Sequence, residues 1–166
     1  MNSCLITGTF DPITLGHLDI IDRCTKIFDK VYVAILVNDA KTTMFNLSDR
    51  IKIAKASFTS YDNVEVLSFD GLCIDLAKAL KVSTIVRGLR GVSDFDYEKN
   101  MAKVNEVTGD IPTMFMMSNV PHISSTVVRE LIRNNGDYAK FLTKEQADII
   151  LEIRKNELRQ YIEKMR

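Results

Sequence analysis

The stretch that decides the fold runs Cys4-Leu5-Ile6-Thr7-Gly8-Thr9-Phe10-Asp11-Pro12-Ile13-Thr14-Leu15-Gly16-His17. Its apolar start, Cys4 to Ile6, predicts a buried strand. A turn of small and polar residues follows, and Thr14 can cap a helix that begins at Leu15. Gly16 then leaves the backbone of the first helical turn open to close approach by a ligand. The pattern predicts a strand, a turn and a helix N-terminus, with His17 in the first turn of that helix.

A second segment, far along the chain, repeats this pattern. Ile123-Ser124-Ser125-Thr126-Val127-Val128-Arg129 follows another apolar run, Met114 to Met117. A helix N-terminus carries unpaired N–H groups and a partial positive charge, so it binds anions. One such end is common, but two that carry His17 and Arg129 predict a single polyanionic ligand held from both sides. A nucleoside triphosphate is the obvious candidate.

The rest of the chain alternates strand-like and helix-like runs, which favours a parallel sheet with right-handed crossovers. We expect strands at Cys4–Thr7, Val31–Val37, Val64–Ser68, Thr84–Arg87 and Thr113–Met117. We expect helices at Leu15–Phe28, Ser48–Ser57, Gly71–Leu80, Asp94–Val107 and Ser125–Asn134. The predicted fold is a single α/β domain over residues 1–166: a five-stranded parallel, Rossmann-like sheet with helices on both faces and a C-terminal helix. Ligands of such sheets bind at the carboxyl ends of the strands.

The tail from Lys144 to Arg166 also has a helical pattern. Its apolar residues fall on one stripe, formed by Ala147, Leu151, Leu158, Ile162 and Met165. We expect this helix to pack on its own domain, and a subunit contact is the alternative.

Composition restricts the partners. Lys and Arg together number 22, as do Asp and Glu, so no overall positive field would attract nucleic acid. The three cysteines and two histidines are scattered, which predicts neither a disulfide framework nor a zinc site, and no protein metal site is expected. No run approaches the roughly 20 apolar residues of a membrane span, and no signal peptide is evident. A cytoplasmic protein without a membrane partner fits best.

Charged residues that follow one predicted strand, Thr84–Arg87, are candidates for chemistry. Arg87 and Arg90 leave a predicted strand with Gly88 between them, and arginine suits planar phosphate groups. Solvated surface charges are the alternative, but the position at the binding edge favours function. Asp94 and Glu98 could orient these arginines, contact a nucleoside, or face water.

The other candidates have simple structural explanations as well. The positive helix end disfavours a charged imidazole, so His17 is expected to be a neutral hydrogen-bond donor. Lys41 in a loop is ordinarily solvated, and the residues Ser124, Ser125 and Thr126 could serve only as N-caps. Known phosphate fingerprints, Gly-x-Gly-x-x-Gly and Gly-x-x-x-x-Gly-Lys-Ser/Thr, are absent, which disfavours a dinucleotide dehydrogenase or a P-loop NTPase.

Together these motifs resemble the nucleotidyltransferase superfamily, and more closely the bacterial phosphopantetheine adenylyltransferase family. The resemblance covers roughly residues 3–142. Its motifs are Gly-Thr-Phe-Asp-Pro-Ile-Thr-x-Gly-His, the Lys41 loop with Met44-Phe45, Asn63-Val64-Glu65-Val66, Arg87-Gly88-Leu89-Arg90, Asp94-Phe95-x-Tyr97-Glu98, Ile123-Ser124-Ser125 and Gly136-Asp137. In combination this set is highly specific.

The resemblance implies transfer of AMP from ATP to the 4′-phosphate of phosphopantetheine, giving dephospho-CoA and pyrophosphate in coenzyme A biosynthesis. It implies Mg²⁺ bound mainly through the ATP phosphates, and a homohexamer. The implied catalytic residues are His17, Thr9, Lys41 and Arg90. The implied ATP-binding residues are Thr9, Phe10, His17, Gly88, Leu89, Arg90, Glu98, Val120, Pro121, His122, Ile123, Ser124, Ser125 and Thr126. The implied acceptor-binding residues are Thr9, Lys41, Cys73 and Arg87.

The chain departs from the family at several positions, none of which removes a proposed donor. Thr7 stands where proline is usual, His122 where an aromatic residue usually precedes Ile-Ser-Ser, and Thr126 where a third serine is common. Cys73 occupies a variable pocket position. Two alternatives remain open: a nucleotidyltransferase acting on another phosphate, such as nicotinamide mononucleotide or glycerol phosphate, and an ATP-binding module without turnover.

Overall fold

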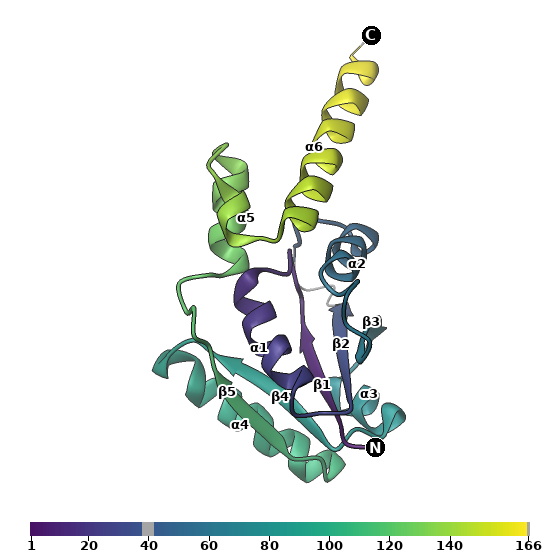
Figure 1. Ribbon diagram of the computed structural model, residues 1–166, viewed down its shortest axis with the longest axis vertical. Helices are drawn as coiled ribbons and strands as arrows, with labels where there is room; N and C mark the ends of the chain where they lie inside the picture. The colour runs from purple at the N-terminus through teal and green to yellow at the C-terminus, as the bar shows by residue number, and fades with distance from the viewer. Residues whose placement is uncertain (38–41, 166) are drawn as a thin grey trace.

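The computed structural model describes residues 1–37 and 42–165, so Lys41 lies outside the described residues (Figure 1). The strands are β1 (Ser3–Gly8), β2 (Lys30–Val37), β3 (Val64–Asp70), β4 (Thr84–Leu89) and β5 (Thr113–Met117). The helices are α1 (Leu15–Thr25), α2 (Leu47–Ala56), α3 (Cys73–Leu80), α4 (Val92–Gly109), α5 (Ser125–Arg133), the short 3₁₀ helix η1 (Tyr138–Phe141) and α6 (Lys144–Lys164).

The five strands form one parallel sheet in the order β3-β2-β1-β4-β5, which confirms the predicted fold class. The chain first winds outward through β2 and β3 and then crosses back to β4. The strand order therefore reverses between β1 and β4. Loops leave this reversal point in opposite directions, and the crevice between them is where such sheets bind ligands.

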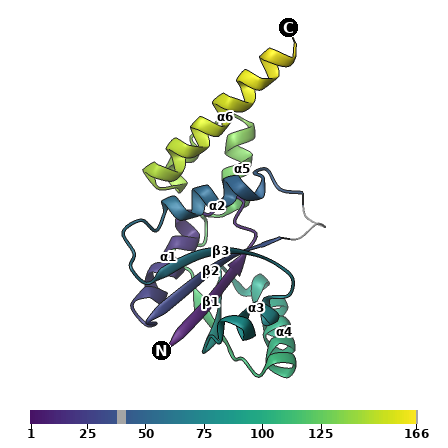
Figure 2. The same ribbon diagram turned by 90° about the vertical axis from the view of Figure 1, so that its right-hand side faces the viewer.

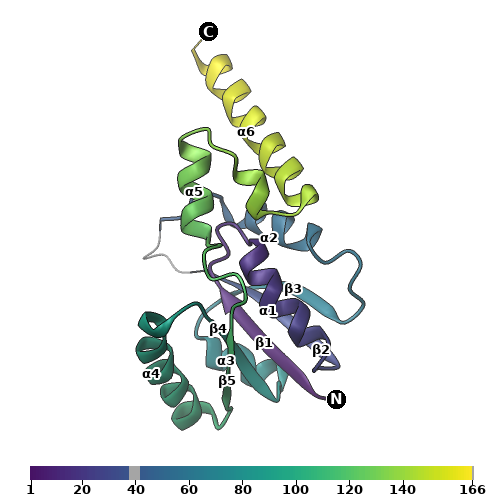
Figure 3. The same cartoon turned by 60° about the vertical axis from the view of Figure 1, so that its left-hand side comes forward.

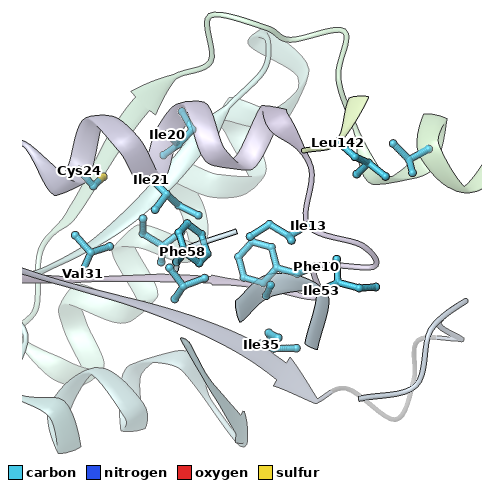
Figure 4. Packing of buried hydrophobic residues seen from close by; sticks show 14 of the residues in the cluster. Phe10, Ile13, Ile20, Ile21, Cys24, Val31, Ile35, Ile53, Phe58 and Leu142 are labelled. Carbon is cyan, nitrogen blue, oxygen red and sulfur yellow. The ribbon is translucent and has the colours of Figure 1, made fainter. Parts of the chain in front are cut away.

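Helices cover both faces because the central strands are apolar on both sides. In β1, Cys4 and Ile6 pack with α1, α2 and α5, whereas Leu5 packs on the other face with α3. This alternation follows from the two-residue period of a strand. Figure 4 shows the larger core, where Phe10 and Ile13 from the loop after β1 meet Ile53 of α2. The loop that carries the first motif is thus anchored in the core.

Helices α5 and α6 lie beyond the carboxyl ends of the strands (Figures 1 and 2). The predicted stripe of α6 is wrong in its details, because the buried residues are Gln146, Ile150 and Ile153. Its first half packs on α2, and its second half projects from the body. The apolar side chains of that second half are exposed, as in Leu158 at 60% and Met165 at 72%. None of the helices in the described part of the chain has the length and apolar character needed to cross a bilayer.

Candidate active site

The loop after β1 is held in place by side chains beneath it. Asp11 is buried, and its two carboxylate oxygens accept the backbone N–H groups of Met44 and Phe45 at 2.7 and 2.9 Å. From α2, Arg50 Nη1 donates to the carbonyl of Thr9 at 2.7 Å. These bonds tie the loop to α2 and to the segment before it. No pattern in the sequence indicated these partners of Asp11 and Arg50.

His17 is fixed by the cap of its own helix. Thr14 is the N-cap residue of α1, and its backbone N–H donates to His17 Nδ1 at 3.0 Å. Because Nδ1 accepts this bond, the ring proton of the neutral imidazole is on Nε2. Burial, aided by the charge of Arg90, lowers the pKa of His17 to about 4. His17 is therefore a neutral donor at physiological pH, as expected, although the main cause is burial.

Phe10 supports the same imidazole from the side. Its φ of 47° lies in the left-handed region, which is uncommon for a residue with a side chain. This conformation accompanies a buried ring that meets the His17 ring edge to face, with centroids 5.1 Å apart. Phe10 thus limits the directions in which the His17 side chain can turn.

The two predicted phosphate-binding segments pack directly on each other (Figure 3). A Cβ atom at Gly16 would lie 2.5 Å from the carbonyl oxygen of Ile123, so only glycine allows this approach. Across the same junction, Ser125 Oγ donates to the carbonyl of Pro12 at 2.8 Å. Arg129 Nη1 donates to the carbonyl of Asp11 at 2.7 Å. Gly16 therefore accommodates the second segment, in addition to any ligand.

Most of the remaining hydroxyls of the second segment also have structural partners. Ser124 is the N-cap of α5, and its Oγ accepts the N–H of Val127 at 3.2 Å. Thr126 Oγ1 accepts from Arg129 at 3.3 Å. Arg129 is thus committed partly to the protein, and the capping roles that the sequence allowed are present.

A cavity of about 410 Å³ opens at the carboxyl ends of β1 and β4. Its walls come from the loop after β1, the first turns of α1, the end of β4 and the start of α4. The lining residues are Ile6, Thr7, Gly8, Phe10, Gly16, His17, Ile20, Val86, Arg87, Gly88, Arg90, Asp94, Tyr97, Glu98, Ser118 and Ile123. The structure thus brings Phe10, His17, Arg87, Gly88, Arg90, Glu98 and Ile123 of the predicted site together around one space.

Other predicted site residues lie near this cavity without lining it. Leu89 is buried, and its carbonyl accepts the N–H of Ser118. The side chains of Pro121 and His122 are exposed. Thr9 lies in the loop between lining residues Gly8 and Phe10. Val120, Ser124, Ser125 and Thr126 belong to the segment that leads into and begins α5.

Arg87 stands where this cavity meets a second one, of about 340 Å³, between α3 and α4. Both cavities are lined by Thr7, Arg87, Tyr97 and Glu98, and the second also by Cys73. Glu98 forms a bidentate ion pair with Arg87, with oxygens 2.7 Å from both Nε and Nη2. Burial alone would lower the pKa of Arg87, but the hydrogen bonds and charge of Glu98 outweigh it, and the pKa is raised. Of the three roles left open for Glu98, orienting an arginine is the one observed.

Arg90 is held more loosely. Its side chain is 53% exposed, and Nε lies 3.6 Å from an oxygen of Asp94. An exposed pair of this kind contributes little to stability. Arg90 is therefore available to a ligand in the cavity.

Asp19 is a site-supporting residue that the sequence did not reveal. Its carboxylate accepts both the backbone and side-chain N–H groups of Asn119 at 2.9 Å, and Arg23 at 3.0 Å. These bonds connect α1 to the loop that leads to Ile123. The only sequence signal was an unremarkable charge pair at helical spacing, so the partner 100 residues away was not predictable.

Comparisons with known proteins agree with this geometry. Residues 5–131 match the cytidylyltransferase-like family model. Phosphopantetheine adenylyltransferase from Campylobacter concisus is 46% identical over 143 residues, covering 84% of this chain and 92% of that protein. Phosphopantetheine adenylyltransferase from Clostridium perfringens is 43% identical over 141 residues, covering 83% and 86%.

A solved structure shares the fold at lower identity. Plasmodium falciparum nicotinic acid mononucleotide adenylyltransferase complexed with NaAD superposes with a TM-score of 0.65 and 17% identity, covering 92% of this chain and 95% of that one. At this identity the likeness concerns the fold alone. The close relatives and the family model, taken with the assembled site, show that the chain belongs to the phosphopantetheine adenylyltransferase family of nucleotidyltransferase enzymes.

Proposed function

We propose that this protein transfers AMP from ATP to the 4′-phosphate of phosphopantetheine, giving dephospho-CoA and pyrophosphate in the cytoplasm. The observation that carries this proposal is the single cavity lined by His17, Arg87, Gly88 and Arg90 at the sheet reversal point. His17 offers a neutral donor and Arg90 a cationic donor to this cavity, and Arg87 also borders the adjoining smaller one. ATP would occupy the larger cavity, and the acceptor would extend from Arg87 into the smaller one.

This reaction needs no general base. The acceptor phosphate is already anionic near neutral pH, so the protein must align two polyanions and stabilise charge that builds at the α-phosphorus. His17 Nε2–H is a preorganised donor for this purpose, because Nδ1 is held by the Thr14 N–H. Arg90 and the predicted contributors Thr9 and Lys41 would add to the same stabilisation. The bond from the acceptor oxygen to the α-phosphorus forms as the bond to pyrophosphate breaks.

The smaller cavity suits an organic arm with an apolar stem. Leu36, Leu72, Ile74, Met101 and Val104 line it, together with Cys73 and Asn105. We assign the pantetheine portion to this space and its phosphate to Arg87 and Lys41.

Mg²⁺ would be held mainly by the ATP phosphates and water. Within residues 1–37 and 42–165, no three carboxylate, thiol or imidazole side chains gather as a metal site. Of the two carboxylates that line this cavity in the described part of the chain, Asp94 is the one that Arg87 does not engage, and it could accept from metal-bound water. Magnesium often binds in this way through phosphates and water with few protein ligands. The ion would supply charge neutralisation on the transferring group.

We propose that the protein forms a homohexamer, as its resemblance to the family implies. Large exposed apolar side chains lie on α4 and the adjoining β5, and others on the projecting half of α6, and such exposed apolar groups are typical of interaction surfaces. They are Val92, Val104 and Val107 of α4, Met114 and Met117 of β5, and Leu158, Tyr161 and Ile162 of α6. Sedimentation velocity should give one species near six times the 18.8 kDa chain mass. A monomer across micromolar concentrations would refute the assembly without affecting the reaction.

One incubation distinguishes the candidate functions. ATP, MgCl₂ and phosphopantetheine are mixed with the protein, pyrophosphate release is followed, and dephospho-CoA is identified by mass. Parallel reactions contain nicotinamide mononucleotide or glycerol phosphate as the acceptor. If product forms only with one of these two compounds, that compound and not phosphopantetheine is the acceptor. If ATP binds but no acceptor leads to pyrophosphate release, the protein is a binding module without turnover. His17→Asn serves as the inactive control.

A further inference from the structure

Thr7 places a hydroxyl group at the site, and the family pattern has no hydroxyl at this position. It is buried near the end of β1, where proline is usual in the family resemblance. Its Oγ1 lies 3.0 Å from Arg87 Nη1 and 3.6 Å from Cys73 Sγ. A hydroxyl has one donor and two acceptor lone pairs, and arginine only donates. Thr7 Oγ1 therefore accepts from Arg87 and donates to Cys73.

The hydrogen bonds of Arg87 show what this hydroxyl adds. Nε and one Nη2 N–H are taken by Glu98. The two Nη1 N–H groups are taken by the carbonyl and the hydroxyl of Thr7, both at 3.0 Å. Arginine has five N–H donors, so one, on Nη2, has no partner among residues 1–37 and 42–165 and can serve a ligand. The guanidinium plane is thus fixed at both ends, by α4 on one side and β1 on the other.

We propose that the Thr7 hydroxyl is a positioning group for Arg87, and through Arg87 for the phosphate of the acceptor; this rests on the proposed function. Without the hydroxyl, Arg87 would be held by Glu98 of α4, a helix whose residues are mostly exposed, and by the Thr7 carbonyl alone on the side of β1. The Thr7 hydroxyl adds a second bond from this central strand, so both Nη1 N–H groups are fixed and the remaining Nη2–H keeps one direction at the junction of the two cavities. Such preorganisation lowers the ordering cost that binding must overcome.

The role of Cys73 in this network is to orient the hydroxyl. By accepting the Thr7 proton, its sulfur turns the oxygen lone pairs toward Arg87. Burial raises the pKa of the Cys73 thiol, although Thr7 and Arg87 oppose this effect, so Cys73 remains a neutral, weak acceptor near pH 7. The network therefore joins β1, α3, β4 and α4 around one guanidinium.

Thr7→Val tests the proposal, because valine keeps the branched shape and removes the hydroxyl. We expect the KM and the calorimetric Kd for phosphopantetheine to rise about three- to tenfold, less than the loss of a direct charged contact. The kcat and the Kd for ATP should stay near wild type. Thr7→Ser, which restores the hydroxyl, should return the acceptor constants toward wild type.

Thr84→Val is the matched control. Thr84 is also buried, at the opposite end of β4, and its hydroxyl donates to the carbonyl of Pro112 at 2.8 Å. Thr84→Val removes a similar hydrogen bond from the same sheet, and it should leave the KM and Kd for phosphopantetheine unchanged. If Thr7→Val does not fold, Thr7→Ala is measured against the same control.

Three results would overturn the proposal: wild-type acceptor constants in Thr7→Val, equal impairment in Thr7→Ser, or an equal loss of ATP and acceptor affinity. Failure of the wild type to adenylylate phosphopantetheine would instead refute the proposed function. The two failures are distinguishable because the second appears before any variant is made.

Discussion

Replacing His17 should affect both stability and turnover, and the two effects can be separated. In His17→Ala, the N–H of Thr14 loses its acceptor, and Thr14 is fully buried. A buried donor without a partner costs about 1–3 kcal/mol. For a chain of this size, each kcal/mol lowers the melting temperature by about 2–4 °C, so a fall of roughly 2–12 °C is expected.

His17→Asn should restore stability without restoring activity. Asparagine Oδ1 is bonded to Cγ, as Nδ1 is in histidine, so it can accept the same Thr14 N–H. It has no donor at the position of Nε2. Loss of one preorganised transition-state donor costs about a hundred- to a thousandfold in kcat, so both variants should be impaired to that extent. Calorimetric melting and steady-state pyrophosphate release measure the two effects.

The pH dependence of stability provides a second test of the same residue. The pKa of His17 is about 4 in the folded protein, against 6.5 for an ordinary histidine. As pH falls, the unfolded chain takes up this proton first, so His17's contribution is complete above pH 6.5 and is lost between pH 6.5 and 4. The slope approaches about 1.4 kcal/mol per pH unit. His17→Asn should lack this component.

Two results would refute the reasoning about His17. A melting temperature of His17→Ala equal to wild type would show that Nδ1 does not cap the helix. A kcat of His17→Asn close to wild type would show that Nε2–H does not serve the reaction.

Three further predictions concern other parts of the chain. Gly16→Ala should lower the free energy of unfolding by about 1–3 kcal/mol and reduce turnover, because the new Cβ would clash with the Ile123 carbonyl oxygen. An unchanged melting temperature would contradict this close approach. Arg90→Met should raise the calorimetric Kd for ATP about tenfold. Arg87→Met should raise the KM for phosphopantetheine while ATP binding stays nearly intact. The reverse pattern would show that Arg87 serves ATP and Arg90 serves the acceptor. Because Cys4 and Cys24 are buried, a thiol reagent should react with Cys73 alone in the native protein. After denaturation without reductant it should react with all three cysteines, and fewer than three reactive thiols would indicate a disulfide.

The sheet and its helices could be predicted because each central strand is an apolar, β-branched run with a clear turn after it. The ends of helices were less certain: α1 ends at Thr25, not Phe28, and α4 begins at Val92. Helix propensity changes little across such ends, and tertiary contacts decide them. The prediction of the buried stripe of α6 was wrong for a related reason. The apolar spacing allowed several faces, and α2 covers the one with Ile150 and Ile153.

The meeting of the two motifs at one edge of the sheet could be predicted, because each motif follows a strand end and parallel topology brings such ends together. The partners of each side chain could not. Glu98 could pair with an arginine or face water until β4 and α4 were placed relative to each other. The bonds of Asp11 to Met44 and Phe45 join loops that have no periodic relation. The role of Lys41 remains a prediction, since it lies outside the described residues.

The junction at Arg87 divides the site into parts that can vary separately. The walls of the larger cavity come mainly from β1, α1 and β4, where the donors of the phosphate chemistry are anchored in the core. The walls of the smaller one come mainly from α3 and α4, and several of its lining side chains, such as Leu72, Met101 and Val104, are exposed. Substitutions on these two helices can therefore reshape the compartment for the organic arm while the phosphate junction stays intact. A lineage built on this scaffold could acquire new acceptors in small steps, without passing through an ancestor that had lost its chemistry.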